Sequence, residues 1–215
     1  MMIIMIVAKY DNHHVYVNGP LEDCGMRVSR EQMQANRLRI LDAASRLFRE
    51  KGFDAVSVAE VMKAAGLTHG GFYGHFDSKD DLVAQAMAHI FTVQETGQGG
   101  GGQDGGGLAA YLDAYLSPWH RDRIGEGCPT AALVADIRRQ AAAARLAMTE
   151  GFRSQIDRVA AALPAGDSAQ ARRQAVGTWA AMVGAVVLAR AIDDPVLSEE
   201  ILHQTRSWIE EKASV

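Results

Sequence analysis

The stretch that decides the fold is SVAEVMKAAGLTHGGFYGHFDSK, residues 57–79. Ser57 can accept a hydrogen bond from the free amides of a new helix, and Glu60, three positions later, completes a capping-box pattern. Apolar residues then recur at i, i+3, i+4 and i+7, which predicts one buried helical face. They are Val58, Val61, Met62 and Ala65. Gly66 suits the left-handed conformation that ends a helix, so we expect a short helix from Ser57 to Gly66.

A second short helix is expected directly afterwards, from about His69 to Phe76. Leu67 returns an apolar side chain to the corner, and Thr68 is the N-cap candidate. Phe72 and Phe76 are its only apolar anchors, so neighbouring elements must hold this helix in place. Two short helices crossed at a glycine-containing turn form a helix-turn-helix, whose second helix enters the major groove of DNA. An ordinary corner of an all-α protein is the alternative.

The residues around this unit resemble a known family. Residues 38–86, LRILDAASRLFREKGFDAVSVAEVMKAAGLTHGGFYGHFDSKDDLVAQA, are similar to the amino-terminal DNA-binding domain of the TetR (tetracycline-repressor) family of bacterial regulators. The resemblance rests on Leu-Phe and Lys-Gly within residues 47–52, the Ala-Gly-Leu-Thr corner, and Phe-Tyr-Gly-His-Phe-Asp-Ser-Lys at 72–79. It implies an all-α chain in which a three-helix DNA-binding domain with a helix-turn-helix precedes a larger helical ligand-binding and dimerisation domain.

Composition indicates a globular protein whose positive charge is local. The chain has 215 residues, is 48% hydrophobic and carries a formal net charge of −4, which argues against a protein that coats nucleic acid. Residues 27–51 nonetheless hold seven arginine or lysine residues against three acidic ones. Among them, Arg37 is expected to face DNA phosphates, with a solvated surface position as the alternative. Two cysteines, Cys24 and Cys128, form no disulfide framework and suit a reducing cytoplasm.

Periodicity divides the chain into an extension and two domains. Residues 1–28 are expected to be poorly ordered, because their apolar start is too short to span a bilayer and lacks the flanks of a secretion signal. The first helix is expected to start at Ser29 and end at Gly52. The helix-turn-helix DNA-binding domain is therefore expected over residues 29–77.

The second domain is expected over residues 78–215. Ser78 would cap a helix whose first turn touches the reading unit, making that helix a lever between the domains. Residues 97–107 contain eight glycines and are expected to form a flexible loop. A polar loop or short turn is expected over residues 119–127, with helices following it.

The last two helices are expected to form a hairpin that dimerises. Residues 169–191 carry apolar side chains on more than one face, and Ser198 is expected to cap the final helix. In the TetR resemblance, the last two helices of each subunit make a four-helix interface, and a two-fold protein suits a palindromic DNA site. Packing of the hairpin within its own domain is the alternative. The expected interface residues are Val176, Trp179, Val183, Val187, Leu202 and Trp208.

The reading helix has little bulk and no arginine or lysine for the usual bidentate contact to guanine. Specificity is therefore expected from His69 and Thr68 together with DNA shape. The resemblance implies phosphate contacts by Tyr73, His75 and Lys79. The full set of expected DNA-binding residues is Arg37, Ser57, Thr68, His69, Gly70, Tyr73, His75 and Lys79.

These features predict a cytoplasmic homodimer that binds a palindromic operator as a repressor and releases it when a small-molecule effector binds between the helices of residues 108–190. We expect no cofactor, metal ion or membrane association. An enzyme is not expected, because no H-E-x-x-H motif, paired-cysteine metal spacing or nucleophile elbow occurs.

Two alternatives depend on Cys128, which lies at an expected helix start where the dipole favours thiolate. One is an electrophile or oxidant sensor on the same scaffold. The other is a helical thiol protein with no DNA role. A small, buried apolar residue is the usual fate of an unpaired cysteine.

Overall fold

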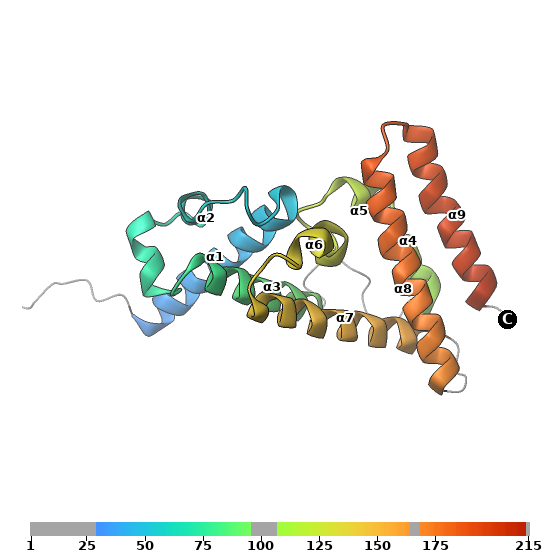
Figure 1. Cartoon of the computed structure of the whole chain (residues 1–215), viewed down its shortest axis with the longest axis horizontal. Helices are drawn as coiled ribbons and strands as arrows, with labels where there is room; N and C mark the ends of the chain where they lie inside the picture. The colour runs from blue at the N-terminus through green and yellow to red at the C-terminus, as the bar shows by residue number, and fades with distance from the viewer. Residues whose placement is uncertain (1–28, 96–106, 164–167, 214–215) are drawn as a thin grey trace, which may run out of the picture.

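The computed structural model describes residues 29–95, 107–163 and 168–213, and every regular element in these ranges is a helix (Figure 1). In chain order they are α1 (Arg30–Lys51), α2 (Val58–Ala64), the 3-10 helix η1 (His69–Gly74), α3 (Lys79–Glu95), α4 (Gly107–Tyr115), α5 (Pro118–Asp122), α6 (Pro129–Ile137), α7 (Ala142–Ala162), α8 (Ser168–Ala191) and α9 (Pro195–Ala213). The all-α fold class is thus confirmed. Our expectations for residues 1–28 and 97–106 lie outside the described residues.

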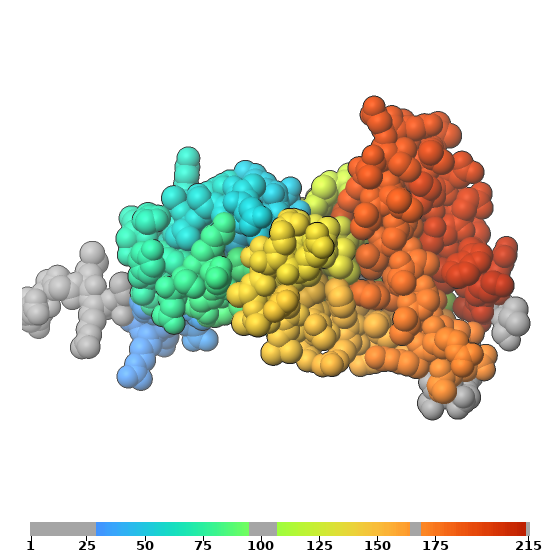
Figure 2. All heavy atoms as spheres, viewed as in Figure 1, coloured from blue at the N-terminus to red at the C-terminus, as the bar shows by residue number. Residues whose placement is uncertain are grey.

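The molecule is elongated, with the helix-turn-helix at one end and a helical hairpin at the other (Figure 1). α1, α2, η1 and α3 gather at the first end, and the antiparallel α8 and α9 form the second. In the space-filling view, α6 and α7 lie between these two masses and connect them (Figure 2). Any signal that passes from the hairpin to the reading unit must therefore cross α6, α7 or the segments next to them.

Short-range signals shape the first end as predicted. Ser57 Oγ accepts a hydrogen bond from the backbone N–H of Glu60 at 3.2 Å, and Ser29 caps α1 in the same way. Gly66 ends the α2 segment with a φ of 70°, in the left-handed region that favours glycine. The Glu60 carboxylate does not return to its cap, because it pairs with Lys51 Nζ at 2.6 Å. That ion pair ties α2 to the end of α1.

Two elements differ in form from our expectations. The second helix of the helix-turn-helix is a 3-10 helix that ends at Gly74, not an α-helix reaching Phe76. Three glycines within this element lower its helix propensity, so packing of its aromatic residues decides its path. Within residues 119–127, where we expected a loop or turn, the chain continues the short helix α5, which Ser117 caps by accepting from the His120 N–H at 3.1 Å.

The start of α9 was also predicted wrongly. The helix begins at Pro195, and Asp194 Oδ1 accepts a hydrogen bond from the Val196 N–H at 2.9 Å, so Asp194 is the cap. Proline suits the first position of a helix, which explains the earlier start. Ser198 lies inside the helix, where it is buried and donates from Oγ to the Ala189 carbonyl at 2.7 Å. It therefore joins α9 to α8.

Two hydrophobic cores hold the protein together. The first is built from α1, α2, η1 and α3, but it also includes Leu133 and Ile137 of α6 and Met148 of α7. The second lies among α4, α7, α8 and α9 around Leu112 and Met182. Because the first core takes side chains from α6 and α7, it crosses the domain boundary that we expected after residue 77.

The packing of α3 on α7 depends on a glycine. A Cβ atom added to Gly151 of α7 would lie 2.3 Å from Cε2 of Phe91, far inside contact distance. Phe91 is 5% exposed, so its ring is enclosed and cannot swing into solvent. The absence of a side chain at Gly151 is what lets the two helices approach each other here.

We predict that Gly151→Ala lowers the free energy of unfolding by about 1–3 kcal/mol, the usual cost of overpacking a core. This outcome opposes helix propensity, which favours alanine over glycine by about 1 kcal/mol. Urea denaturation would measure it. Combining Gly151→Ala with Phe91→Leu should recover part of the loss, because the two residues interact directly. A single variant as stable as the parent would contradict this contact.

Candidate DNA-binding site

η1 is held by two buried rings and presents its remaining residues outward. Phe72 and Phe76 are 1% and 2% exposed, and their rings stack with 5.6 Å between centroids. Tyr73 is 71% exposed and meets the Phe72 ring edge-on. A Cβ atom at Gly70 or Gly74 would meet no atom within 4 Å. The backbone of η1 can therefore come close to another surface.

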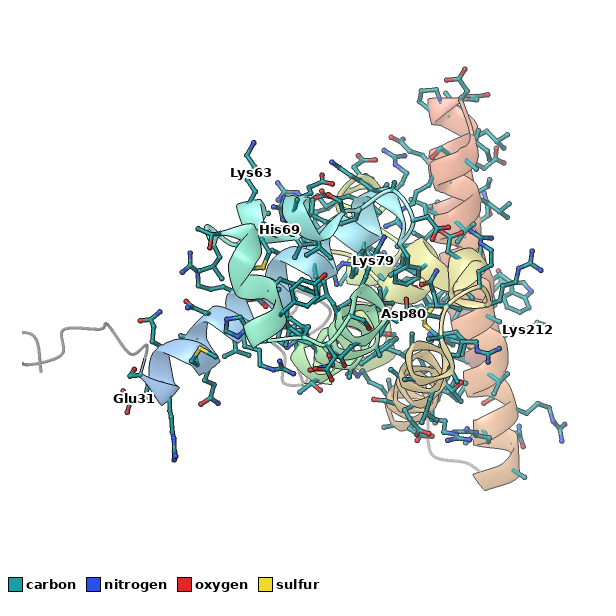
Figure 3. All side chains as sticks on the ribbon, turned by 60° about the vertical axis from the view of Figure 1, so that its left-hand side comes forward. Glu31, Lys63, His69, Lys79, Asp80 and Lys212 are labelled. Atoms are coloured by element: carbon teal, nitrogen blue, oxygen red, sulfur yellow. The ribbon has the colours of Figure 1, made fainter. Side chains whose placement is uncertain are left out.

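The open surface around η1 includes most of the expected contact residues. Ser57, Thr68 and His69 are exposed, as are Gly70 and Tyr73. They come from the start of α2, the turn and η1 itself, so the two-helix geometry places them together. Figure 3 shows His69 on η1 at this end of the molecule.

Lys79 is the first residue of α3 and is partly buried. The N-terminus of a helix disfavours a cation, whereas the following Asp80 and Asp81 suit this position. Figure 3 shows Lys79 and Asp80 side by side at the start of α3. An external anion would therefore stabilise the charge of Lys79 more than its own helix does.

Arg37 makes contacts within the protein that we did not expect. Its guanidinium group donates to the backbone carbonyl of His75 and to Oε1 of Gln85, and it lies 4.5 Å from the centre of the Phe76 ring. Both terminal nitrogens are thus used inside the protein. Arg37 joins α1 to the end of η1 and to α3, so it holds the reading unit in position; its expected contact with DNA phosphates stays a prediction. The sequence carries no signal for this contact, because Arg37 and Gln85 lie far apart in the chain.

His75 is partly buried beside Arg37. Burial, with the Arg37 charge as the second cause, holds the pKa of His75 below the usual value of 6.5. The imidazole is therefore neutral at pH 7. It can donate one hydrogen bond to a phosphate oxygen, but it brings no charge.

The hairpin presents apolar side chains at the far end of the molecule. Val176, Val187 and Trp208 are 43%, 38% and 49% exposed. Leu188, which we did not single out, is 55% exposed on the same helix as the two valines. Leu202, also expected at the interface, is only 2% exposed and belongs to the second core, so its side chain is already buried within the protomer.

Trp179 and Val183 are partly buried and pack on the second core. The Trp179 ring lies 5.0 Å from that of Phe152, between centroids. These two residues are partly used within the protomer, so they test a dimer less cleanly than the more exposed valines of α8.

Cys128 lies at the N-cap position of α6 and is 4% exposed. Its backbone N–H donates to Nε2 of His120 at 2.8 Å, and His120 Nδ1 donates to the Tyr115 carbonyl at 2.6 Å. His120 is therefore neutral, with its proton on Nδ1. Burial is the main cause that lowers its pKa, and Arg190 contributes. The burial of Cys128 favours its interpretation as a packing residue; Cys24 lies outside the described residues.

Two arginines connect this region to its surroundings. Arg190 of α8 donates to the carbonyls of His120 at 2.8 Å and Arg121 at 2.9 Å, which closes the end of α5. Arg49 of α1 donates from Nε to the Gly125 carbonyl at 2.7 Å. Arg190 therefore ties α5 to α8, and Arg49 ties the loop between α5 and α6 to α1. Burial lowers the pKa of Arg49 to about 10, so it stays charged at neutral pH.

Within residues 29–95, 107–163 and 168–213, no group of three or more His, Cys, Asp or Glu side chains is placed to hold a metal ion.

The fold and the exposed surface around η1 define a helix-turn-helix domain. Residues 40–86 match the sequence profile described as bacterial regulatory proteins, tetR family. This end of the chain is thus similar to the DNA-binding domain of TetR-family regulators. Over 59 residues it is 42% identical to the HTH-type transcriptional regulator AcrR of Shigella flexneri, and over 71 residues it is 36% identical to TtgR of Pseudomonas putida. These matches span 27% and 33% of this chain, and only 27% and 32% of the relatives' own lengths.

Solved structures share the fold over most of the chain. The reduced form of Escherichia coli NemR superposes with a TM-score of 0.68 and 22% identity, covering 82% of this chain and 96% of that one. A TetR-family regulator from Agrobacterium tumefaciens superposes with a TM-score of 0.66 and 24% identity, covering 83% of this chain and 98% of that one. The resemblance therefore extends to the arrangement of the second set of helices.

We predict that His120 makes stability depend on pH. Its folded-state pKa lies below 6.5, so the unfolded chain takes up a proton first as pH falls through that value. The stability that neutral His120 contributes is present above pH 6.5 and is lost below it. Urea midpoints at pH 7.5 and 5.0 should therefore differ less in His120→Gln than in the parent. His203→Gln, at an exposed position of α9, is the control and should keep the parent's difference. Equal differences in all three proteins would refute the role of His120.

Proposed function

We propose that this chain is a cytoplasmic, homodimeric transcriptional regulator that binds a palindromic operator, represses transcription, and releases DNA when a small molecule binds. The observation that carries the proposal is the exposed surface of η1, fixed from behind by the buried Phe72 and Phe76. The regulators that resemble the amino-terminal end support it, and they favour a binding protein over an enzyme.

The proposed DNA contacts divide into two kinds. Tyr73, Lys79 and neutral His75 would bind phosphate oxygens, which sets affinity and position but carries no sequence information. His69 and Thr68, beside the bare backbone at Gly70, would face base edges. The absence of arginine and lysine from η1 leaves a larger share of specificity to DNA shape.

The proposed dimer would bury the exposed apolar residues of α8 and α9. Within residues 169–191, an 18-residue window has a mean hydropathy of 1.3, enough by length and composition for a membrane span. α8 nevertheless packs on α7 and α9, and its remaining apolar side chains suit a second copy of the hairpin. Two-fold symmetry would place the two η1 elements about 34–36 Å apart, or a multiple of this distance, to match successive turns of DNA.

The proposed effector would bind among the helices of residues 108–190. Four buried polar atoms in this region have no hydrogen-bond partner among the described residues: Tyr115 Oη, Thr130 Oγ1, Trp179 Nε1 and Arg190 Nη1. Such atoms are costly to leave unpaired, so they supply the polar contacts that a ligand among these helices would use. A thiol sensor at Cys128 is the second candidate, but at 4% exposure the thiol is shielded from reagents.

We predict that Tyr73→Ala and Lys79→Ala weaken binding to all DNA sequences, whereas His69→Ala changes the preferred operator. Fluorescence anisotropy with DNA from upstream of the gene would measure this. Each operator would contact two copies of Lys79, so the slope of log affinity against log salt should fall by about two for Lys79→Ala.

Lys212→Ala is the matched control, because this lysine lies at the end of α9, remote from η1 (Figure 3). It should leave affinity and slope unchanged. If the three η1 and α3 variants bound DNA like the parent, the assigned reading surface would be wrong.

We also predict that Val187→Asp, on the exposed face of α8, gives a folded monomer. An unpaired charge would be buried in the dimer but not in the separate protomer. Sedimentation equilibrium would report the mass, and far-UV circular dichroism the helix content. Operator affinity should fall as well.

Val134→Asp is the control for that experiment, because Val134 of α6 is 41% exposed, close to the 38% of Val187. It should leave the dimer intact. A dimeric Val187→Asp protein would place the interface elsewhere.

A further inference from the structure

A cleft of about 790 Å³ lies between the helix-turn-helix end and the loop that precedes α6. One face of α1 forms its base, and α2, α3, Trp119 and the loop at Gly125 surround it. The cleft shares only Trp119, Gly125 and Glu126 with residues 108–190, among which the effector region was proposed above, and its other lining residues come from α1, α2, α3 and the turn after α2. It also touches the loop that Arg49 fastens to α1.

Positive charge predominates in this cleft. Its cationic side chains are Arg39, Arg46, Arg49 and Lys63, against the two carboxylates Asp42 and Glu126. Asp42 Oδ1 lies 2.7 Å from Nε2 of His89. Arg39 and Lys63 are exposed and have no ion-pair or hydrogen-bond partner among the described residues. Two cations are thus free to bind an anion.

Two arginines of α1 line one side of the cleft. Arg39 and Arg46 lie seven residues apart, which puts them on the same face of the helix, two turns from each other. Arg46 has only a 3.5 Å ion pair with Glu50, and both side chains are substantially exposed. Such a pair is weak in water and yields readily to a better partner.

The cleft also has apolar walls. Ala43 and Ile90 line it, and both are buried. Trp119 stands at its edge with 45% of its surface exposed, although tryptophan gains much from burial. The phosphate groups of a DNA backbone would leave this apolar surface unused. A concave site with apolar walls and a few charges is typical of small-molecule binding.

We propose that this cleft binds a small organic anion. Its carboxylate, sulfonate or phosphate group pairs with Arg39 and Arg46, and its apolar or aromatic body packs on Ile90 and Trp119. The bound anion bridges α1 and the loop at Gly125, so it sets the position of the helix-turn-helix against α5 and α6. This last consequence rests on the proposed function, whereas binding itself does not.

Calorimetry with the full chain tests the site, using 2-naphthoate and its neutral counterpart 2-naphthamide as probes at low salt. 2-Naphthoate is expected to bind at least about tenfold more tightly, since a charge-assisted pair with arginine contributes that much. The double variant Arg39→Gln/Arg46→Gln should lose about tenfold for 2-naphthoate and nothing for 2-naphthamide. Trp119→Ala should weaken both probes.

Arg173→Gln is the control, because Arg173 is an exposed arginine of α8 away from the cleft lining; both affinities should stay at the parent's values. Equal affinity for the two probes, or an unchanged 2-naphthoate affinity in the double variant, would overturn the proposal. The proposal would also be overturned if the double variant kept its 2-naphthoate affinity but bound DNA more weakly in the absence of any probe. Arg39 and Arg46 would then bind DNA phosphates and not a small anion. DNA binding is measured separately, so a chain that binds 2-naphthoate as expected but no DNA refutes only the proposed function.

Discussion

Burial of Phe72 and Phe76 is the interaction on which the helix-turn-helix end depends. η1 has six residues, three of them glycine, and such a segment has no stable helical form of its own in water. The two rings supply the apolar surface that fixes it. The guanidinium group of Arg37 lies over the Phe76 ring and donates a hydrogen bond to the carbonyl of His75, directly after η1. Because Phe72 and Phe76 hold the backbone from the inside, small residues such as glycine can occupy the outer face of η1.

Most helix boundaries could be predicted from short-range chemistry. Ser57 and Gly66 act within one turn of themselves, so their effect is legible in the sequence. The start of α9 was missed for a local reason as well, because Asp194 and Pro195 form a stronger start signal than Ser198. The 3-10 form of η1 was missed because a pattern of apolar spacing does not distinguish it from a short α-helix.

Long-range contacts in the candidate site were not predictable in this way. The sequence marked Arg37 as a cation near a DNA-binding element, but its partners at His75 and Gln85 are set by how α1 crosses η1 and α3. Likewise, the alkyl side chain of Leu202 indicates burial but not whether its own core or a partner buries it. The cleft beside Trp119 was missed for the same reason, since it is made from four separate parts of the chain.

The first hydrophobic core has a consequence for how this protein could be rearranged. Leu133, Ile137 and Met148 reach into it from α6 and α7, so the DNA-binding end has no complete core of its own. If two relatives exchanged only their DNA-binding ends by recombination, the apolar side chains of α6 and α7 would no longer match the core that they enter. Some of these side chains would be exposed, and others would leave voids. A successful exchange would have to carry the matching faces of α6 and α7 with it, which restricts modular evolution of operator choice in chains built like this one.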